Sequence, residues 1–329
     1  MCKNLYLCTN FIVSKMINRI LLRIKVIQIL YSYYKGEGMS AEDAEKELFI
    51  SIERTYDLYF YLLQLVVEVT DYASRRIEAG KSKITATFEE RNPQTKFIEN
   101  KFAFQLKQNL MLKDYVENHN ISWDGHEEMI KELYEKISES ELYAEYMASP
   151  ESSYEKDKEL WRSVFKRVIP VDESLGRELE EISIYWNDDA DTVVSFIIKT
   201  IKQFEEEAGE NQRLQPMFKD DEDKEFVRDL LKNAIYHSSD YRALIDKHIG
   251  KSWDMDRLAF MDIVIMLAAL SELHSFPNIP INVTMNEFIE ITKSYSTPKS
   301  HVFVNGILDS IVKDLRENKK LIKVAYVNR

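Results

Sequence analysis

The scarcity of glycine and proline constrains the fold of this chain more than any other feature. The 329 residues include 8 Gly and 7 Pro, about 5% together, whereas globular proteins contain roughly 12%. Sheet-rich folds use these residues at most of their connections. Because this composition supplies few turns, the sequence predicts an all-α protein built from long helices. One large or two moderate domains are expected at this length.

The charge is distributed unevenly along the chain. The formal net charge is −12, yet residues 1–36 hold six bases and no acid, and residues 299–329 hold seven bases and three acids. Residues 120–225, in contrast, hold 29 acids and 13 bases. Acidic surfaces repel the phosphate backbone. The total charge therefore disfavours a nucleic-acid partner. The two basic ends are nevertheless compatible with one.

Both cysteines lie within the first eight residues, at Cys2 and Cys8, which excludes a disulfide framework. The opening residues lack the unbroken apolar stretch of a signal peptide. The apolar run from Leu258 to Leu270 is shorter than a membrane span and contains Asp262. We expect a cytoplasmic protein, with Met16 as a candidate natural start.

Helical periodicity extends through most of the chain. Apolar residues recur at helical spacing from Ile17 to Tyr34, and a second helix is predicted from a Ser40 N-cap, with Asp43 at the capping-box position, to Gly80. Residues 209–223 are the best linker candidate. Further helices are expected at 94–119, 222–236, 240–249, 255–274 and 281–295, and a last one from a Thr297 N-cap, with Pro298 in its first turn, to about Lys320.

Patterns for catalysis and for metal or cofactor binding are missing from the sequence. His126-Glu127 begins a zincin-like motif, but Ile130 stands where that motif needs its second histidine. The G-x-G from Gly36 to Gly38 follows a helix and lacks the third glycine of a phosphate-binding loop. The sequence therefore predicts no enzymatic activity, no cofactor and no metal ion.

A basic line is predicted on the first helix. Lys15, Arg19 and Arg23 are four residues apart and lie opposite the predicted apolar face, with Lys25 on the flank. Such a line, with Gln28 nearby, can follow a phosphate backbone. A solvated or helix-pairing face explains these residues alone equally well.

The segment from Ile279 to Asp309 resembles the C-terminal signature of the transcription antitermination factor NusB family. Residues 257–273 are similar to another helix of that family, and residues 18–32 resemble its first helix with the arginine-rich motif. The resemblance covers roughly 16–80 and 222–318, and residues 85–215 have no counterpart in compact members. The matching C-terminal positions are Asn286-Glu287, Lys293, Ser300, Phe303-Val304-Asn305-Gly306 and Leu308-Asp309.

This resemblance implies an all-α bundle of two helical subdomains with a large helical insertion. The expected parts are a non-native or disordered extension at 1–15, an N-terminal subdomain at 16–84, an acidic insertion at 85–215, a C-terminal subdomain at 216–320 and a basic tail at 321–329.

The resemblance also implies a function. NusB proteins bind the boxA element of nascent RNA together with the ribosomal protein NusE, within RNA polymerase elongation complexes that contain other Nus factors, and support transcription of ribosomal RNA operons. Arginines that grip phosphates and aromatic rings that stack on bases suit single-stranded RNA. The RNA-binding positions expected here are Arg19, Arg23, Lys25, Gln28, Tyr295, Lys299 and Phe303, and the partner-facing positions are Tyr31 and Asp262.

Some positions depart from the family pattern. Ile20 and Leu21 replace basic residues, Lys299 replaces an acid and Val302 replaces a base. About four phosphate contacts would give a salt slope near −3, roughly a 50-fold loss of affinity between 50 and 200 mM salt. An RNA methyltransferase with a NusB-like domain is a rival interpretation of the function. It needs a glycine-rich methyl-donor loop, which this sequence does not contain. A helical protein-interaction scaffold with a vestigial RNA site remains an alternative.

Overall fold

The computed structural model describes residues 18–36, 38–218, 220–249 and 258–324. All regular elements in these ranges are helices, which confirms the predicted all-α class. Within them the chain forms two compact units: unit 1 comprises residues 53–217, and unit 2 comprises residues 18–52 and 218–324. None of the described helices is long and apolar enough to cross a membrane.

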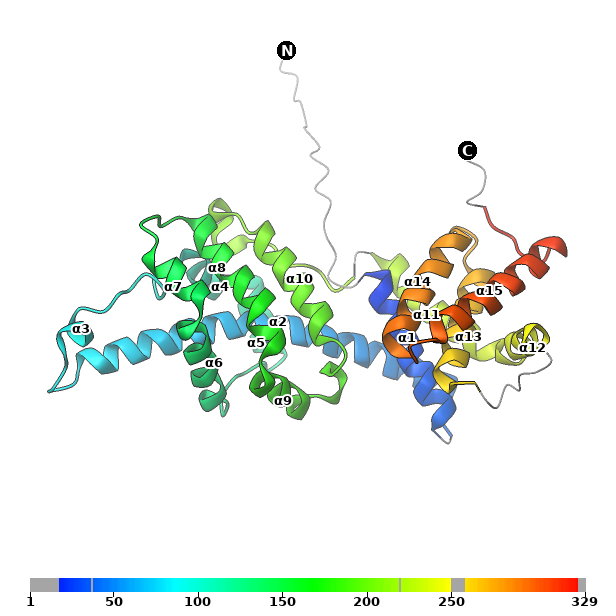
Figure 1. Cartoon of the computed structure of the whole chain (residues 1–329), viewed down its shortest axis with the longest axis horizontal. Helices are drawn as coiled ribbons and strands as arrows, with labels where there is room; N and C mark the ends of the chain where they lie inside the picture. The colour runs from blue at the N-terminus through cyan, green and yellow to red at the C-terminus, as the bar shows by residue number, and fades with distance from the viewer. Residues whose placement is uncertain (1–17, 37, 219, 250–257, 325–329) are drawn as a thin grey trace, which may run out of the picture. The chain divides into compact units, whose positions relative to one another are not determined.

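Unit 2 is built around one central helix. Helix α13 contacts α1, α11, α12, α14 and α15, so the N-terminal α1, blue in Figure 1, lies among helices from the C-terminal third of the chain. Besides the first part of α2 (Ala41–Lys81), the unit contains α1 (Arg19–Lys35), α11 (Asp221–Tyr236), α12 (Ser238–His248), α13 (Phe260–Ser275), α14 (Ile281–Tyr295) and α15 (Ser300–Glu317).

Helix α13 is buried on all sides. Every residue from Asp262 to Leu273 is buried, as expected for a helix that is apolar around most of its circumference. Two carboxylates, Asp262 and Glu272, are buried with it. A buried charge is costly unless it is paired and hydrogen-bonded, so these two residues require partners inside unit 2.

Helix α1 is also largely buried, which corrects the predicted basic line. Leu22, Val26 and Ile29 are buried along with Leu21, Ile27 and Leu30 of the predicted apolar face, whereas Ile20 of that face is exposed. Arg23 and Lys25 are only 2% and 1% exposed. The sequence pattern is misleading here because the residues around these bases are themselves apolar, so that no polar face exists. Lys15 lies outside the described residues.

Helix α2 begins where the sequence predicts. The backbone nitrogen of Asp43 donates to Ser40 Oγ at 3.1 Å, which confirms the N-cap. The helix then continues to Lys81 without interruption. Only its first part belongs to unit 2, because Tyr56 and Tyr59 are buried within unit 1 and hydrogen-bond there, to the Gln215 carbonyl and to Thr200. The structural division at 52/53 therefore differs from the expected boundary at 84/85.

Unit 1 surrounds the rest of α2 with shorter helices (Figure 1). These are α3 (Phe88–Arg91), α4 (Lys101–Gln108), α5 (Leu110–Asn118), α6 (Glu127–Glu139), α7 (Glu141–Ala148), α8 (Tyr154–Arg167), α9 (Glu173–Ile182) and α10 (Ala190–Gln203), with short 3-10 turns at Ile169–Val171, Ile184–Trp186 and Glu206–Asn211.

The single helix predicted over 94–119 is divided at Asn109. Its side-chain oxygen accepts from Leu112 N at 2.9 Å and caps α5, while its amide nitrogen donates to the Gln212 carbonyl at 2.7 Å. Asparagine competes with the helical backbone for hydrogen bonds. The two hydrogen bonds of the buried Asn109 side chain therefore end α4 and start α5. Apolar periodicity does not predict this break.

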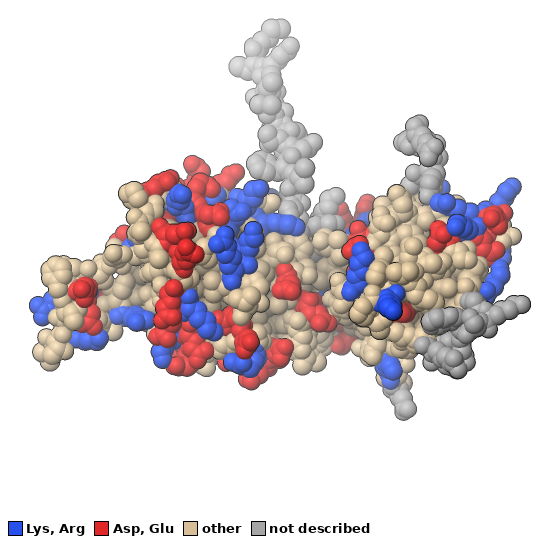
Figure 2. All heavy atoms as spheres, viewed as in Figure 1, with Lys and Arg blue, Asp and Glu red and all other residues tan. Residues whose placement is uncertain are grey.

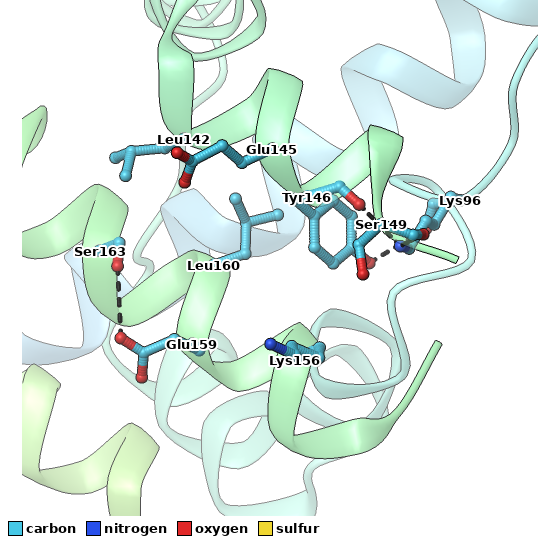
Figure 3. A pocket seen from close by; sticks show the side chains of 9 residues that line it. All are labelled: Lys96, Leu142, Glu145, Tyr146, Ser149, Lys156, Glu159, Leu160 and Ser163. Atoms are coloured by element: carbon cyan, nitrogen blue, oxygen red, sulfur yellow. Dashed lines mark hydrogen bonds between the residues drawn. The ribbon is translucent and has the colours of Figure 1, made fainter. Parts of the chain in front are cut away.

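A shallow hollow of unit 1 illustrates how its loops are fixed (Figure 3). The Lys96 ammonium points toward the end of α7 and donates to the carbonyls of Tyr146, Ser149 and Glu151 at 2.6 to 2.9 Å. Cations stabilise helix C-termini in this way. Lys96 is therefore a structural cap.

Unit 1 carries most of the negative charge of the protein. Residues 53–217 contain 34 acids and 21 bases. In Figure 2 acidic and basic side chains are interspersed over the visible face of unit 1, whereas much of the visible surface over α14 is uncharged. The excess of acid in unit 1 disfavours a nucleic-acid contact there.

Candidate nucleic-acid interface

Arg23 forms a buried ion pair at the centre of unit 2. Its Nε and Nη2 donate to the two carboxylate oxygens of Glu272 at 2.7 and 2.9 Å, and Thr284 Oγ1 donates to the same carboxylate at 2.8 Å. The guanidinium also lies 5.4 Å from the ring centroid of Phe226. With Arg23 and Glu272 side chains 3% and 0% exposed, this is a bidentate pair that joins α1 to α13.

The burial of Arg23 and Lys25 corrects the expectation of an exposed phosphate-binding stripe. A phosphate cannot reach a side chain that is 3% exposed unless unit 2 rearranges, and Lys25 is equally enclosed. The pair with Glu272 gives Arg23 a structural task in unit 2. Glu272 is not singled out by the sequence, although an acid two residues beyond the apolar run from Leu258 to Leu270 is an available signal.

Arg19 is more accessible, but it is also engaged. Its Nε donates to Asp223 Oδ1 at 3.2 Å, its Nη2 lies 4.0 Å from Glu222 Oε2, and the guanidinium is 4.9 Å from the Phe226 ring centroid. The Arg19 side chain remains 36% exposed. Arg19 therefore presents part of its guanidinium to solvent at the N-terminal end of α1.

Asp262 is expected to face a partner protein, but in the structure it holds two helices of unit 2 together. Its carboxylate accepts from Ser296 Oγ at 2.6 Å and from Ser300 Oγ at 2.8 Å, and Asp262 is 4% exposed. The first turn of α13 is thereby tied to the turn between α14 and α15. A partner protein cannot contact this carboxylate directly, so the expectation of a surface acid is corrected.

The same hydrogen bonds relocate the start of the last helix. Helix α15 begins at Ser300 after an N-cap at Lys299, so the predicted N-cap at Thr297 is wrong. The Thr297 hydroxyl instead pairs with Ser300 Oγ at 2.7 Å. These side chains form a compact polar turn around Asp262 in place of an additional helical turn.

Three of the expected RNA-binding residues lie in or beside this turn. Lys299 is exposed, while Tyr295 and Phe303 are half-buried at the end of α14 and the start of α15. On α1, Gln28 is half-buried, and so is Tyr31, whose ring meets Phe260 edge-on at 5.2 Å.

The expected RNA-binding residues lie in two groups at opposite ends of α13. Arg19 and Arg23 lie near Glu272, toward the end of that helix, whereas the Lys299 turn is held by Asp262 in its first turn. Ten residues of helix separate the two carboxylates by about 15 Å. The structure therefore does not bring Arg19 and Lys299 together in one pocket.

The last described residues of the chain pack against the C-terminal end of α13. Lys323 Nζ donates to the Phe276 carbonyl at 2.8 Å and lies 3.4 Å from the Glu272 carbonyl, at the last turn of α13. Burial lowers the pKa of Lys323. The described part of the predicted basic tail is thus folded against unit 2.

Comparison with known proteins identifies the C-terminal helices as a family domain. The model of the NusB family matches residues 191–313. The transcription antitermination protein NusB of Salinibacter ruber is 34% identical over 108 residues, which cover 33% of this chain and 67% of that protein. The proteins of the same name from Methylacidiphilum infernorum and Lactiplantibacillus plantarum are 42% and 32% identical over 95 and 113 residues, covering 29% and 33% of this chain and 66% and 81% of those proteins.

No solved structure matches the chain. The relatives are transcription antitermination proteins by name, and this chain spans about two thirds or more of their length. They account for only about a third of its own 329 residues. The family match at 191–313 confirms the resemblance of the C-terminal segment, whereas it does not include residues 18–32, whose resemblance stays a prediction. The chain belongs to the NusB family.

Proposed function

We propose that this protein is an RNA-binding transcription antitermination factor. In this proposal it binds boxA-type nascent RNA together with NusE, works in the RNA polymerase elongation complex with other Nus factors, supports transcription of ribosomal RNA operons and catalyses no reaction. The observation that carries the proposal is the match of the C-terminal helices to NusB proteins.

The structure refines which residues would contact RNA. Arg19 and Lys299 offer accessible positive charge, and Tyr295 and Phe303 offer aromatic rings beside Lys299. Arg23 and Lys25 support the interface from within unit 2. Since the Arg19 and Lys299 sites lie toward opposite ends of α13, the proposed ligand is an extended single strand that touches both ends of that helix.

The salt dependence of RNA binding tests this two-point interface. Two phosphate contacts predict a slope of log affinity against log salt near −1.4, roughly a sevenfold loss between 50 and 200 mM salt, whereas four contacts predict a slope near −3. We expect Arg19→Ala and Lys299→Ala each to reduce the slope by about 0.7. Fluorescence anisotropy with a labelled boxA-type RNA, with and without NusE, measures it.

A matched control is Lys313→Ala, which removes an exposed lysine that pairs with Asp309 on α15. This substitution should leave both affinity and slope nearly unchanged. A flat salt response of the unaltered protein, or equal behaviour of the three variants, would contradict the two-point interface.

A second candidate function is a protein-interaction scaffold with a vestigial RNA site. It is favoured by the pairing of both α1 arginines with internal carboxylates and by the acidic residues 53–190 of unit 1, which the family model does not match. Arg19→Glu discriminates the two functions, since Arg23 cannot be reversed without disturbing the core. Unchanged affinity for boxA RNA in the presence of NusE favours the scaffold, and a loss favours RNA binding.

A further inference from the structure

The first turn of α11 places a group of acids against the accessible arginine of α1. Of these, Asp223 is the innermost, with a side chain 2% exposed and Oδ1 3.2 Å from Arg19 Nε. Glu222 is 82% exposed and lies 4.0 Å from Arg19 Nη2. Asp221, in the same turn, is 93% exposed and pairs with Lys224 at 3.5 Å.

Phe226 fixes the guanidinium in front of these acids. Its ring centroid is 4.9 Å from the guanidinium carbon of Arg19, and a ring face holds a cation at this distance. Arg19 is thus held between an aromatic face and two carboxylates, and its side chain remains 36% exposed to solvent. Carboxylate and phosphate oxygens accept hydrogen bonds from the same guanidinium donors.

We propose that the first turn of α11 is a built-in competitor for RNA, in which Asp223 and Glu222 hold Arg19 in place of a phosphate and weaken binding at this end of the interface. The proposal rests on the proposed RNA-binding function and adds its regulation. A phosphate that approaches Arg19 must share the guanidinium with Asp223 and lie near the Glu222 carboxylate. Like charges at this separation oppose binding.

A supporting role for Asp223 in RNA binding predicts the opposite effect of removing it. If Asp223 serves mainly to orient Arg19 for RNA, its loss should weaken binding. Asp223→Asn separates these roles because the amide oxygen can still accept from Arg19 Nε while the negative charge is removed. Glu222→Gln removes the exposed charge, and its 82% exposed side chain leaves folding unaffected.

The test uses the full chain and a fluorescein-labelled single-stranded boxA-type RNA at 100 mM salt, with affinities measured by anisotropy. We expect Asp223→Asn to bind about fivefold more tightly and Glu222→Gln about twofold more tightly, as expected for removing one partly screened charge. Asp221→Asn is the matched control, because it removes the same charge from the same turn without contacting Arg19, and its affinity should change less than 1.5-fold, about the measurement error.

A double-mutant cycle ties the effect to Arg19. In an Arg19→Ala background, the gains from Asp223→Asn and Glu222→Gln should disappear. The proposal is overturned if those gains persist without Arg19, if they do not exceed that of Asp221→Asn, or if Asp223→Asn weakens binding while its thermal unfolding midpoint is unchanged. Should Asp223→Asn fail to fold, Glu222→Gln decides. An absence of RNA binding in all forms, with and without NusE, instead contradicts the proposed function itself.

Discussion

Glu272→Ala should lower the free energy of unfolding of unit 2 by about 3–5 kcal/mol, because it leaves the buried guanidinium of Arg23 without its carboxylate partner. The Arg23 guanidinium loses both short hydrogen bonds to this carboxylate, and its side chain, 3% exposed, cannot turn to water. Glu287, 3.9 Å from Arg23 Nη1, offers only a distant substitute. Native-state hydrogen exchange of the α13 amides measures this loss within unit 2 alone.

Two further variants separate the pair from its surroundings. The double variant Arg23→Met with Glu272→Met replaces the two charges by apolar chains of similar length and should recover most of the loss. Glu290→Ala breaks an exposed pair with Lys293 on α14 and should cost less than about 0.5 kcal/mol. A loss below about 1 kcal/mol for Glu272→Ala would show that the buried pair does not organise unit 2.

Trp161→Ala should destabilise unit 1 by about 3–5 kcal/mol, the range for truncating a large buried aromatic side chain. Trp161 lies on α8 and is 1% exposed, and its ring centroid is 5.8 Å from that of Phe97. The cavity left by the indole cannot be filled by the neighbouring rigid helices without distortion. Hydrogen exchange of the α8 amides reports the change.

Trp161→Phe is the control for the aromatic packing. The buried indole Nε1 has no hydrogen-bond partner among the described residues, so replacing it by a phenyl ring leaves no polar group newly unpaired. We expect less than half the loss caused by alanine. Equal losses for the two variants would contradict the packing argument.

The helical class of this protein follows from composition, whereas the division of its helices does not. Few glycines and prolines and a continuous apolar periodicity suffice to predict the all-α class, and the local pattern of Ser40 and Asp43 predicts the start of α2. The break at Asn109 and the start of α15 at Ser300 depend on polar side chains that bind groups distant in the sequence, Gln212 and Asp262. Periodicity carries no information about such partners.

The candidate interface shows the same limit. Spacing correctly groups Arg19 and Arg23 on one helix, but it assigns both to solvent. In the structure one is buried against Glu272, which lies 249 positions away, and the other contacts Asp223, 204 positions away. The two acids were not recognisable as partners because acids are abundant in this chain.

The sequence by itself determined the helical class and the family of the C-terminal half, because composition and local motifs are properties of neighbouring residues. The tertiary structure alone decided which charges reach solvent. Burying α1 and α13 together removes Arg23, Lys25 and Asp262 from the surface. A charge transferred from water into a core must be paired there, and its partner can come from any part of the chain that the fold brings near.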